Sequence, residues 1–182
     1  MRSLIQVALA VVWISSASYA QSEQRPYAGQ EKREIKALSA EDIQALESGQ
    51  GMGFAKAAEL NQYPGPKHVL ELAAELKLSD QQKADAQKIY DRMHSEATRL
   101  GASLIIRERE LDQLFANKQI DSDKLRGMVG KIARLQGELR VAHLQAHLEM
   151  RRLLSPVQIK KYDELRGYNS GGSEHKGHPH QR

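Results

Sequence analysis

The sequence predicts an all-α protein, an elongated antiparallel helical hairpin with short flanking helices at capped bends. Two long segments, 79–117 and 122–154, carry apolar residues at the three- and four-residue spacing of a helix face. The connection "NKQIDSD" between them is so short that the two helices must be antiparallel neighbours. The pattern Leu-Ser-x-x-Gln occurs twice, as "LSDQQ" at one end of this pair and as "LSPVQ" at the other. At about 1.5 Å per residue, the hairpin is roughly 50–60 Å long.

Each Leu-Ser-x-x-Gln pattern predicts the start of a helix. A serine followed three residues later by glutamine forms a capping box: the serine hydroxyl accepts from the N3 amide, and the glutamine side chain reaches back to the serine amide. Ser79 with Gln82 therefore starts the first long helix, and Ser155 with Gln158 starts a short helix after the second. One helix ends at each leucine and another begins at each serine, so the repeat marks two matched bends.

The second long helix carries a heptad seam, in which apolar residues alternate three and four positions apart. The residues of this seam are Leu125, Met128, Ile132, Leu135, Leu139, Ala142 and Ala146. Beside the seam, Val141, Leu144 and Leu148 form a second apolar strip. Either the short flanking helices fold back over this strip, or it pairs two copies of the chain. We expect a homodimer, because exposed apolar strips on small helical proteins usually find a partner.

The first twenty residues predict a secretory signal. "MRSLIQVALAVVWISSASYA" has a positive charge at Arg2, an apolar run too short to span a bilayer and a small-residue cleavage site after Ala20. We therefore expect export to a bacterial periplasm, with no membrane span after signal removal. The absence of cysteine spares the chain oxidative pairing in that compartment.

The mature chain divides into three predicted regions. We expect a polar arm with short helices over 21–66, a helical domain over 67–168 and a flexible tail over 169–182. The arm should be loose as far as Lys36, where the sequence is polar. A first short helix follows, with Ser39 as its N-cap.

Composition and motifs exclude other classes of protein. The formal net charge is only +4, and no dense tract of Lys and Arg is interleaved with aromatic residues, so we do not expect nucleic-acid binding. No nucleophile elbow, P-loop, zinc-protease or dinucleotide motif is present, and the carboxylates alternate with Lys and Arg on helix faces. We therefore do not expect an enzyme.

The two bends and the export signal resemble the Spy/CpxP/ZraP superfamily of periplasmic stress proteins. The Leu-Thr-x-x-Gln motif of that group matches "LSDQQ" and "LSPVQ", with serine in place of threonine, and the resemblance covers roughly 67–168. The segment "GMGFAKAAELNQYPGPKHVLEL" is similar to the start of heavy-metal-resistance members of the group. The resemblance implies a hooked hairpin paired as a dimer. It also implies one of two roles, ATP-independent chaperoning of unfolded envelope proteins or metal binding and sensing.

Histidines supply a candidate metal site. His143 and His147 stand four residues apart on a helix, a spacing that lets two imidazoles bind one ion, and Met150 follows. If the chain turns near residue 119 or 120, residue n faces about 239 − n, which places His94 level with this pair. Three imidazoles and a thioether suit copper, nickel or zinc. The alternative is that all of them are solvent-facing polar residues.

The tail offers a second metal-binding hypothesis. Its Gly, Ser and Pro residues do not support a packed structure, and a loose His-rich segment can scavenge metal ions. Its histidines are His175, His178 and His180. The alternative is a solubilising tail.

Basic side chains supply a candidate surface for unfolded proteins. They lie among aliphatic residues on both long helices, where their stems can cover apolar clients while their charges stay hydrated. The residues of this surface are Arg92, Arg99, Arg107, Arg126, Lys131, Arg134 and Arg140. We expect a periplasmic chaperone that holds unfolded envelope proteins and requires no cofactor. The alternative is a heavy-metal-binding resistance or sensor protein for copper, nickel or zinc, and a membrane sensor kinase stays open as a partner.

Overall fold

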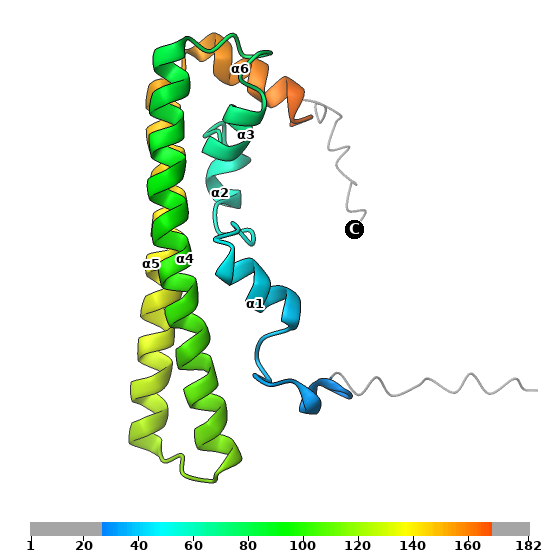
Figure 1. Ribbon diagram of the computed structural model, residues 1–182, viewed down its shortest axis with the longest axis vertical. Coiled ribbons are helices and arrows are strands. Elements are labelled where there is room, and N and C mark those ends of the chain that lie inside the picture. Colours follow the sequence, from blue (N-terminus) through cyan, green and yellow to red (C-terminus); the bar gives the residue numbers. More distant parts are fainter. Residues whose placement is uncertain (1–26, 169–182) are drawn as a thin grey trace, which may run out of the picture.

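In the computed structural model, which describes residues 27–168, two long helices form an antiparallel hairpin and short helices line one of its faces (Figure 1). This all-helical architecture confirms the predicted fold class. The elements, in chain order, are η1 (Gln30–Lys32), α1 (Ala40–Glu47), α2 (Lys56–Glu59), α3 (Pro66–Glu71), α4 (Asp80–Ala116), α5 (Ser122–Leu153) and α6 (Pro156–Leu165).

The hairpin helices begin and end close to the predicted positions. Ser79 and Asp121 are the N-caps of α4 and α5, and each accepts hydrogen bonds from backbone amides of its own helix. Arg92 of α4 is hydrogen-bonded to Glu149 of α5. The sequence-based register pairs residue 92 with residue 147, two positions before Glu149. The predicted register of the two helices therefore agrees with this contact to within two residues.

Both predicted capping boxes are present. Ser79 Oγ accepts from the Gln82 amide at 3.1 Å, and Gln82 Oε1 accepts from the Ser79 amide at 3.1 Å. At the second bend, Ser155 Oγ accepts from the Gln158 amide at 3.3 Å and Gln158 Oε1 accepts from the Ser155 amide at 2.9 Å. The two motifs therefore cap helices, as the sequence indicates.

The two capping glutamines also bond to each other, which the sequence alone does not show. Each side-chain amide donates to the other's Oε1 at 3.0 Å. Gln82 Nε2 donates further to the carbonyl of Leu153 at 3.1 Å, and Gln158 Nε2 to the carbonyl of Leu76 at 3.2 Å. Each glutamine thus caps its own helix and satisfies a carbonyl from the other bend. We call this reciprocal pair the glutamine clasp.

The hydrophobic core has two parts along the hairpin. The first lies near the glutamine clasp and contains residues such as Val69, Ile89, Met150 and Tyr162. The second lies farther along the hairpin, and its buried members are Ile35, Leu46, Ala97, Leu100, Leu104, Ile105, Ile132 and Leu139. Met93 is half-buried and packs against both parts. The core is therefore continuous through Met93 at the level where the two parts meet.

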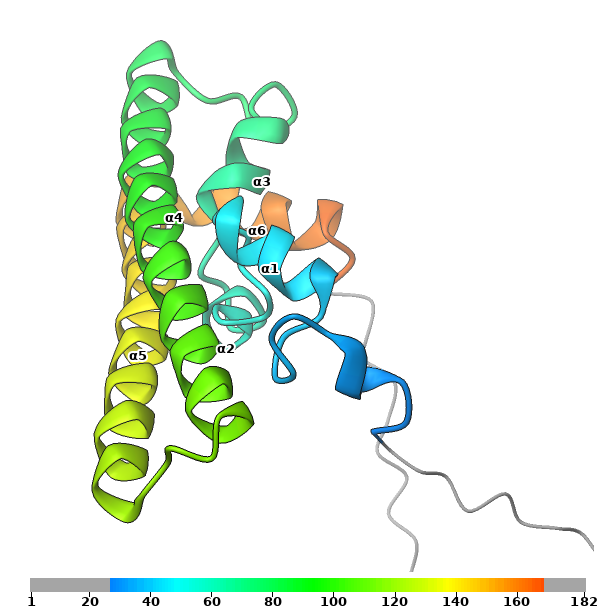
Figure 2. The same cartoon turned by 60° about the horizontal axis from the view of Figure 1, so that its bottom comes forward.

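The short helices pack on one face of the hairpin (Figure 2). Helix α1 contacts α4, α2 contacts α5, and α3 contacts both. At the end of α1, the backbone approaches so closely that a Cβ atom added to Gly101 would lie 2.3 Å from the carbonyl oxygen of Leu46. A glycine is required in α4 at this crossing, because no side chain fits there.

The end of the polar arm is anchored to the hairpin, so the prediction that the arm is loose as far as Lys36 is wrong at residues 34–36. Ile35 is completely buried in the second part of the core. Beside it, Glu34 pairs with Arg109 at 3.0 Å and Lys36 pairs with Asp112 at 3.2 Å. A single isoleucine among charged residues has no periodicity, so the sequence pattern gave no sign of this anchor. The signal (1–20) and the tail (169–182) lie outside the described residues.

The second apolar strip is not covered by the short helices, so that interpretation is wrong. Val141 is 62% exposed and Leu148 is 41% exposed, and Leu144 is half-buried. The seam itself is buried at Met128, Ile132, Leu139 and Ala146 and opens towards the hairpin turn, where Leu125 is 38% exposed. The homodimer remains a prediction.

Candidate functional site

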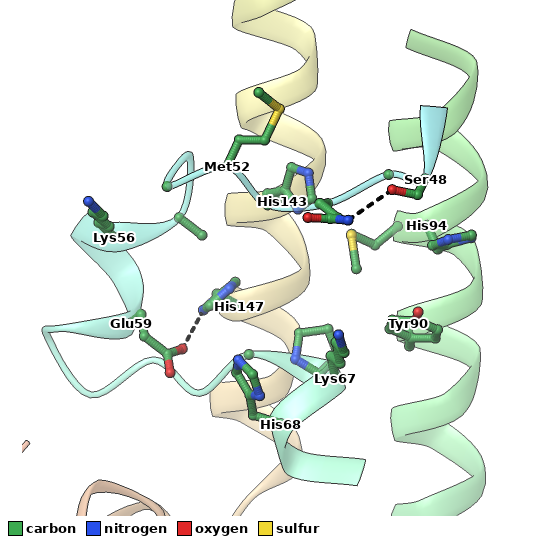
Figure 3. A pocket seen from close by; sticks show the side chains of 18 of the residues that line it. Ser48, Met52, Lys56, Glu59, Lys67, His68, Tyr90, His94, His143 and His147 are labelled. Atoms are coloured by element: carbon green, nitrogen blue, oxygen red, sulfur yellow. Dashed lines mark hydrogen bonds and ion pairs between the residues drawn. The ribbon is translucent and has the colours of Figure 1, made fainter. Parts of the chain in front are cut away.

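A pocket of about 660 Å³ lies between the short helices and the hairpin, at the level where the two parts of the core meet (Figure 3). Its walls are the loop 48–56, α2, the start of α3 and the facing sides of α4 and α5. All four histidines of the described chain line it: His68, His94, His143 and His147. We call it the histidine pocket.

His143 projects from α5 and is only 5% exposed. Its ring stacks on Phe54, with ring centroids 6.0 Å apart and an interplanar angle of 16°. Burial, and secondarily the neighbouring His147, hold the pKa of His143 below its ordinary value of 6.5. The imidazole is therefore neutral at pH 7. Its Nε2 atom is buried and has no hydrogen-bond partner, so it is a candidate ligand atom.

His147 lies one turn later and is 8% exposed. Its Nδ1 lies 2.7 Å from the carbonyl oxygen of Tyr63. Because a carbonyl can only accept, Nδ1 is the donor, which leaves Nε2 as the ring atom that can offer a lone pair to a ligand. Gly65 makes room for this edge of the ring, since a Cβ atom there would lie 3.0 Å from Cε1 and 3.2 Å from Nε2.

Glu59 of α2 brings a carboxylate to the pocket. Its Oε1 accepts from the hydroxyls of Tyr162, at 2.5 Å, and Tyr168, at 2.9 Å. Burial and this hydrogen bond raise the pKa of Tyr162, so its hydroxyl stays a donor. The other oxygen, Oε2, is buried without a hydrogen-bond partner and lies 3.6 Å from His147 Nδ1. Sequence reasoning missed Glu59, because it lies on a four-residue helix and its partners are far away in the chain.

The other two histidines lie nearer the rim. His94 of α4 stacks on Tyr90, with centroids 5.5 Å apart. His68 of α3, which sequence reasoning did not include, donates from Nδ1 to Glu71 at 2.7 Å. Within residues 27–168, no three His, Cys, Asp or Glu side chains are grouped closely enough to form a ready-made metal site.

The structure divides the predicted metal ligands into two groups. His94, His143 and His147 do line one pocket, and His143 and His147 are buried, so the alternative that they face solvent is wrong for these two. Met150 does not line the pocket; it is fully buried in the first part of the core. His175, His178 and His180 lie outside the described residues.

A family model for heavy-metal resistance matches residues 51–161, more than half of the chain. The chain belongs to the heavy-metal resistance family. This family is part of the Spy/CpxP-like superfamily, which confirms the predicted resemblance. Neither a curated protein nor a solved structure matches the chain.

The family match covers all four pocket histidines and both Leu-Ser-x-x-Gln motifs. Proteins of the family are generally periplasmic and are not known as enzymes. In the described part of the chain, no helix has both the length and the apolar character needed to cross a membrane.

The basic surface predicted for unfolded proteins is largely paired with carboxylates. Five of its arginines form ion pairs: Arg92 with Glu149, Arg99 with Glu96, Arg107 with Glu110, Arg126 with Asp123, and Arg134 with Glu138. Exposed pairs of this kind contribute only about 0–1 kcal/mol, so a client could replace them. For Lys131 and Arg140, no ion pair is present in the described residues. Client binding by this surface remains a prediction.

The hairpin has a second cavity, an apolar groove of about 610 Å³ lined only by α4 and α5. Its floor includes Ile89, Met93, Val141 and Ala146. Its edges carry the ion pairs of Arg92 and Arg134. We call it the bare-face groove, because no short helix contributes to it.

Proposed function

We propose that the protein acts in heavy-metal resistance by binding a copper, nickel or zinc ion in the histidine pocket. One observation carries this proposal: two buried side-chain atoms without hydrogen-bond partners, His143 Nε2 and Glu59 Oε2, belong to residues that line the same pocket. Buried polar atoms without partners are rare in native proteins because each lost hydrogen bond costs about 1–3 kcal/mol.

The donor set fits such an ion. Imidazole and carboxylate are common ligands of zinc, and imidazole also suits copper and nickel. His143 is held neutral by burial, and the Tyr63 carbonyl leaves Nε2 of His147 as the basic atom of that ring. The hydroxyls of Tyr162 and Tyr168 orient Glu59 from the side away from its unpartnered oxygen. Outer partners of this kind fix ligand geometry in metal sites.

Binding requires the pocket to contract, because its donors are not grouped as a ready-made site. We expect the loop 48–56 and α2 to move towards α5, since these segments are short and contain Gly49, Gly51 and Gly53. The ion would then neutralise the Glu59 carboxylate and occupy the lone pairs of the imidazoles.

Isothermal calorimetry with Zn²⁺, Ni²⁺ and Cu²⁺ tests this proposal on the full chain. We expect a stoichiometric site in the wild type, and its loss in the His143→Ala/His147→Ala pair and in the isosteric Glu59→Gln. The His175→Ala/His178→Ala/His180→Ala variant is the matched control and should keep the site. Retention of the site by the pocket variants and its loss in the tail variant would assign binding to the tail.

We therefore propose metal binding as the main function and chaperoning as the second, the reverse of the order predicted from sequence. Sequence reasoning placed the chaperone first, on the export signal, the matched Leu-Ser-x-x-Gln bends, the exposed-looking arginines and the family resemblance. The ion pairing of those arginines and the family match now favour the metal function. A periplasmic location and a membrane sensor kinase as the receiver of the metal signal are part of this proposal.

The bare-face groove favours a second function, the ATP-independent holding of unfolded envelope proteins. Val141 is 62% exposed within an apolar groove rimmed by weak ion pairs, which suits loose binding of apolar segments. A client-aggregation assay with chelator present tests it. We expect delayed aggregation that Val141→Asp reduces and the His143→Ala/His147→Ala pair does not. Unprotected clients at every chaperone concentration would exclude this second function.

A further inference from the structure

We infer that the metal-free protein binds a small oxyanion, of the phosphate or carboxylate class, in the histidine pocket between the loop 48–56 and the start of α3. Its hydrogen-bond donors are backbone amides of this loop and the side chains of Lys56, Lys67 and His143. This inference goes beyond the proposed metal function and does not rest on it. It assigns a role to the glycine-rich stretch "SGQGMG", all six residues of which line the pocket.

Unpaired backbone amides in the loop are the first argument. Within residues 27–168, the amides of Gly51, Met52 and Gly53 donate no hydrogen bond. The carbonyl of Gly51 accepts from the amide of Phe54 at 2.7 Å, which closes a tight turn. Both central residues of this turn are left-handed, with φ angles of +42° at Met52 and +81° at Gly53. Successive amides in turns of this kind form concave nests that bind anions.

The charge of the pocket wall is the second argument. Lys56, Lys67 and Arg166 line the pocket against one carboxylate, Glu59, so the wall has a formal charge of +2 when its imidazoles are counted as neutral. Glu59 is bonded to two tyrosine hydroxyls and lies 3.6 Å from Arg166. The two lysines are exposed and form no ion pair with any described residue. They therefore supply the positive charge that an anion would neutralise.

Contacts with the turn place two of these donors beside it. A Cβ atom added to Gly53 would lie 3.7 Å from Lys56 Nζ, so the lysine lies against the turn. A Cβ atom added to Gly51 would lie 4.0 Å from His143 Nδ1. The other ring nitrogen of His143 is buried without a hydrogen-bond partner, and in the metal-free protein it can carry the ring proton and donate. Lys67 lies across the pocket from the loop (Figure 3).

The donor set favours an oxyanion over a halide. Phosphate and carboxylate groups have several acceptor oxygens, which amides and ammonium groups can share in charge-assisted hydrogen bonds. Glu71, on which Lys67 also acts, is bonded to His68 and does not line the pocket. The pocket volume of about 660 Å³ leaves room for an organic group attached to the anion. Phosphate and carboxylate share this chemistry, so the test compares them.

The test is a ¹⁵N NMR titration of the full chain, freed of metal on a chelating resin. The probes are inorganic phosphate, citrate and sodium chloride, compared at equal ionic strength. Lys56→Gln/Lys67→Gln removes the two lysines of the pocket. The matched control is Lys131→Gln/Lys160→Gln, which also removes two exposed lysines without ion pairs in the described residues, but outside the pocket. Thermal melting and helical circular dichroism report the fold of each variant.

We expect phosphate or citrate to cause saturable shifts in the amide signals of Gly51, Met52 and Gly53, and sodium chloride to leave these signals unchanged. The preferred probe then identifies the class of oxyanion. Lys56→Gln/Lys67→Gln should weaken binding by about tenfold or more, because charge-assisted bonds are lost. The control pair should bind like the wild type.

Three outcomes would overturn the inference. Equal shifts with sodium chloride would mean that the anions only screen charge. Saturation without shifts in the three loop amides would place the anion elsewhere. Equal weakening by both lysine pairs would mean that only the net charge of the protein matters.

Failure of this inference is distinguishable from failure of the proposed function, because zinc calorimetry is carried out in phosphate-free buffer. Zinc binding without phosphate or citrate binding would leave the metal site standing and remove the anion site. Phosphate or citrate binding without zinc, nickel or copper binding would do the reverse.

Discussion

The two faces of the hairpin invert the usual arrangement of polar and apolar side chains. The face covered by α1, α2 and α3 buries two histidines and a carboxylate, and leaves one atom of His143 and one of Glu59 without hydrogen-bond partners. The bare face leaves Val141 and Leu148 exposed to solvent. Burial of polar groups and exposure of apolar ones are both unfavourable to an isolated chain.

This difference indicates that each face is completed by something other than the chain described. The covered face offers nitrogen and oxygen donors in a half-open pocket, the proposed place of a small cation. The bare face offers an apolar groove with charged edges, which suits a polypeptide. The proposed metal and polypeptide ligands would thus bind opposite faces of the same pair of helices, so a substitution can be directed at one face without touching the other.

The largest expected effect comes from uncovering the covered face. In Gly101→Ala, the new Cβ atom would lie 2.3 Å from the Leu46 carbonyl oxygen, so α1 must shift. We expect a loss of about 1–3 kcal/mol in the free energy of unfolding, measured by urea denaturation. Gly137→Ala is the control, because no atom lies within 4 Å of its added Cβ on the bare face. It should gain up to about 1 kcal/mol from helix propensity. A neutral Gly101→Ala would show that α1 is not anchored at this crossing.

The second largest expected loss of stability comes from disrupting the glutamine clasp, which joins the two bends at one end of the hairpin. Ser79→Ala and Ser155→Ala should each cost about 0.5–2 kcal/mol of stability, because each removes a cap. Gln82→Ala and Gln158→Ala should show a coupling of about 0.5 kcal/mol or more in a double-mutant cycle, since the two amides bond to each other. Strictly additive costs in urea denaturation would mean that the reciprocal bonds contribute nothing.

A smaller effect is the pH dependence of the covered face. The folded pKa of His143 lies below its ordinary value of 6.5, so below that pH the unfolded chain takes up the proton first. Stability is therefore complete above pH 6.5 and falls as the pH is lowered through it. With a chelator present, lowering the pH from about 8 to about 5 should reduce the urea midpoint of the wild type. The midpoint of His143→Gln should fall less, because that variant has no imidazole at position 143 to protonate. Parallel curves over the whole range would contradict the assignment, and parallel behaviour above pH 6.5 is the internal control.

The smallest effect on folding is expected on the bare face. Val141→Asp should change the free energy of unfolding of the monomer by no more than about 0.5 kcal/mol, because the side chain is exposed. It should nevertheless shift the sedimentation profile from dimer to monomer if this face pairs two copies. Val157→Asp, at an exposed valine of α6, should leave the profile unchanged. A wild type that sediments as a monomer at micromolar concentration would remove the dimer prediction.

The candidate site could be predicted from sequence only in part. His143 and His147 were identifiable because they lie on one helix, where spacing fixes direction, and His94 because a short turn fixes the register of two helices. Glu59 and His68 were not identifiable, because they lie on α2 and α3, two short helices whose positions depend on packing. The prediction that Met150 is a metal ligand was wrong, because its burial also depends on tertiary packing. Met150 shares a helix with the histidines, but the chain around α6 closes over it.

The sequence by itself determined the helices, their caps and the antiparallel register, because these depend on contacts within a few residues or across one short turn. It also determined the family, through the two Leu-Ser-x-x-Gln motifs. Only the tertiary structure decided which face of the hairpin is covered, that the two glutamines bond to each other, and that Ile35 anchors the arm. These contacts join residues that are far apart in the sequence, and no local pattern encodes them. The histidine pocket arises where these long-range contacts bring the short helices against the hairpin.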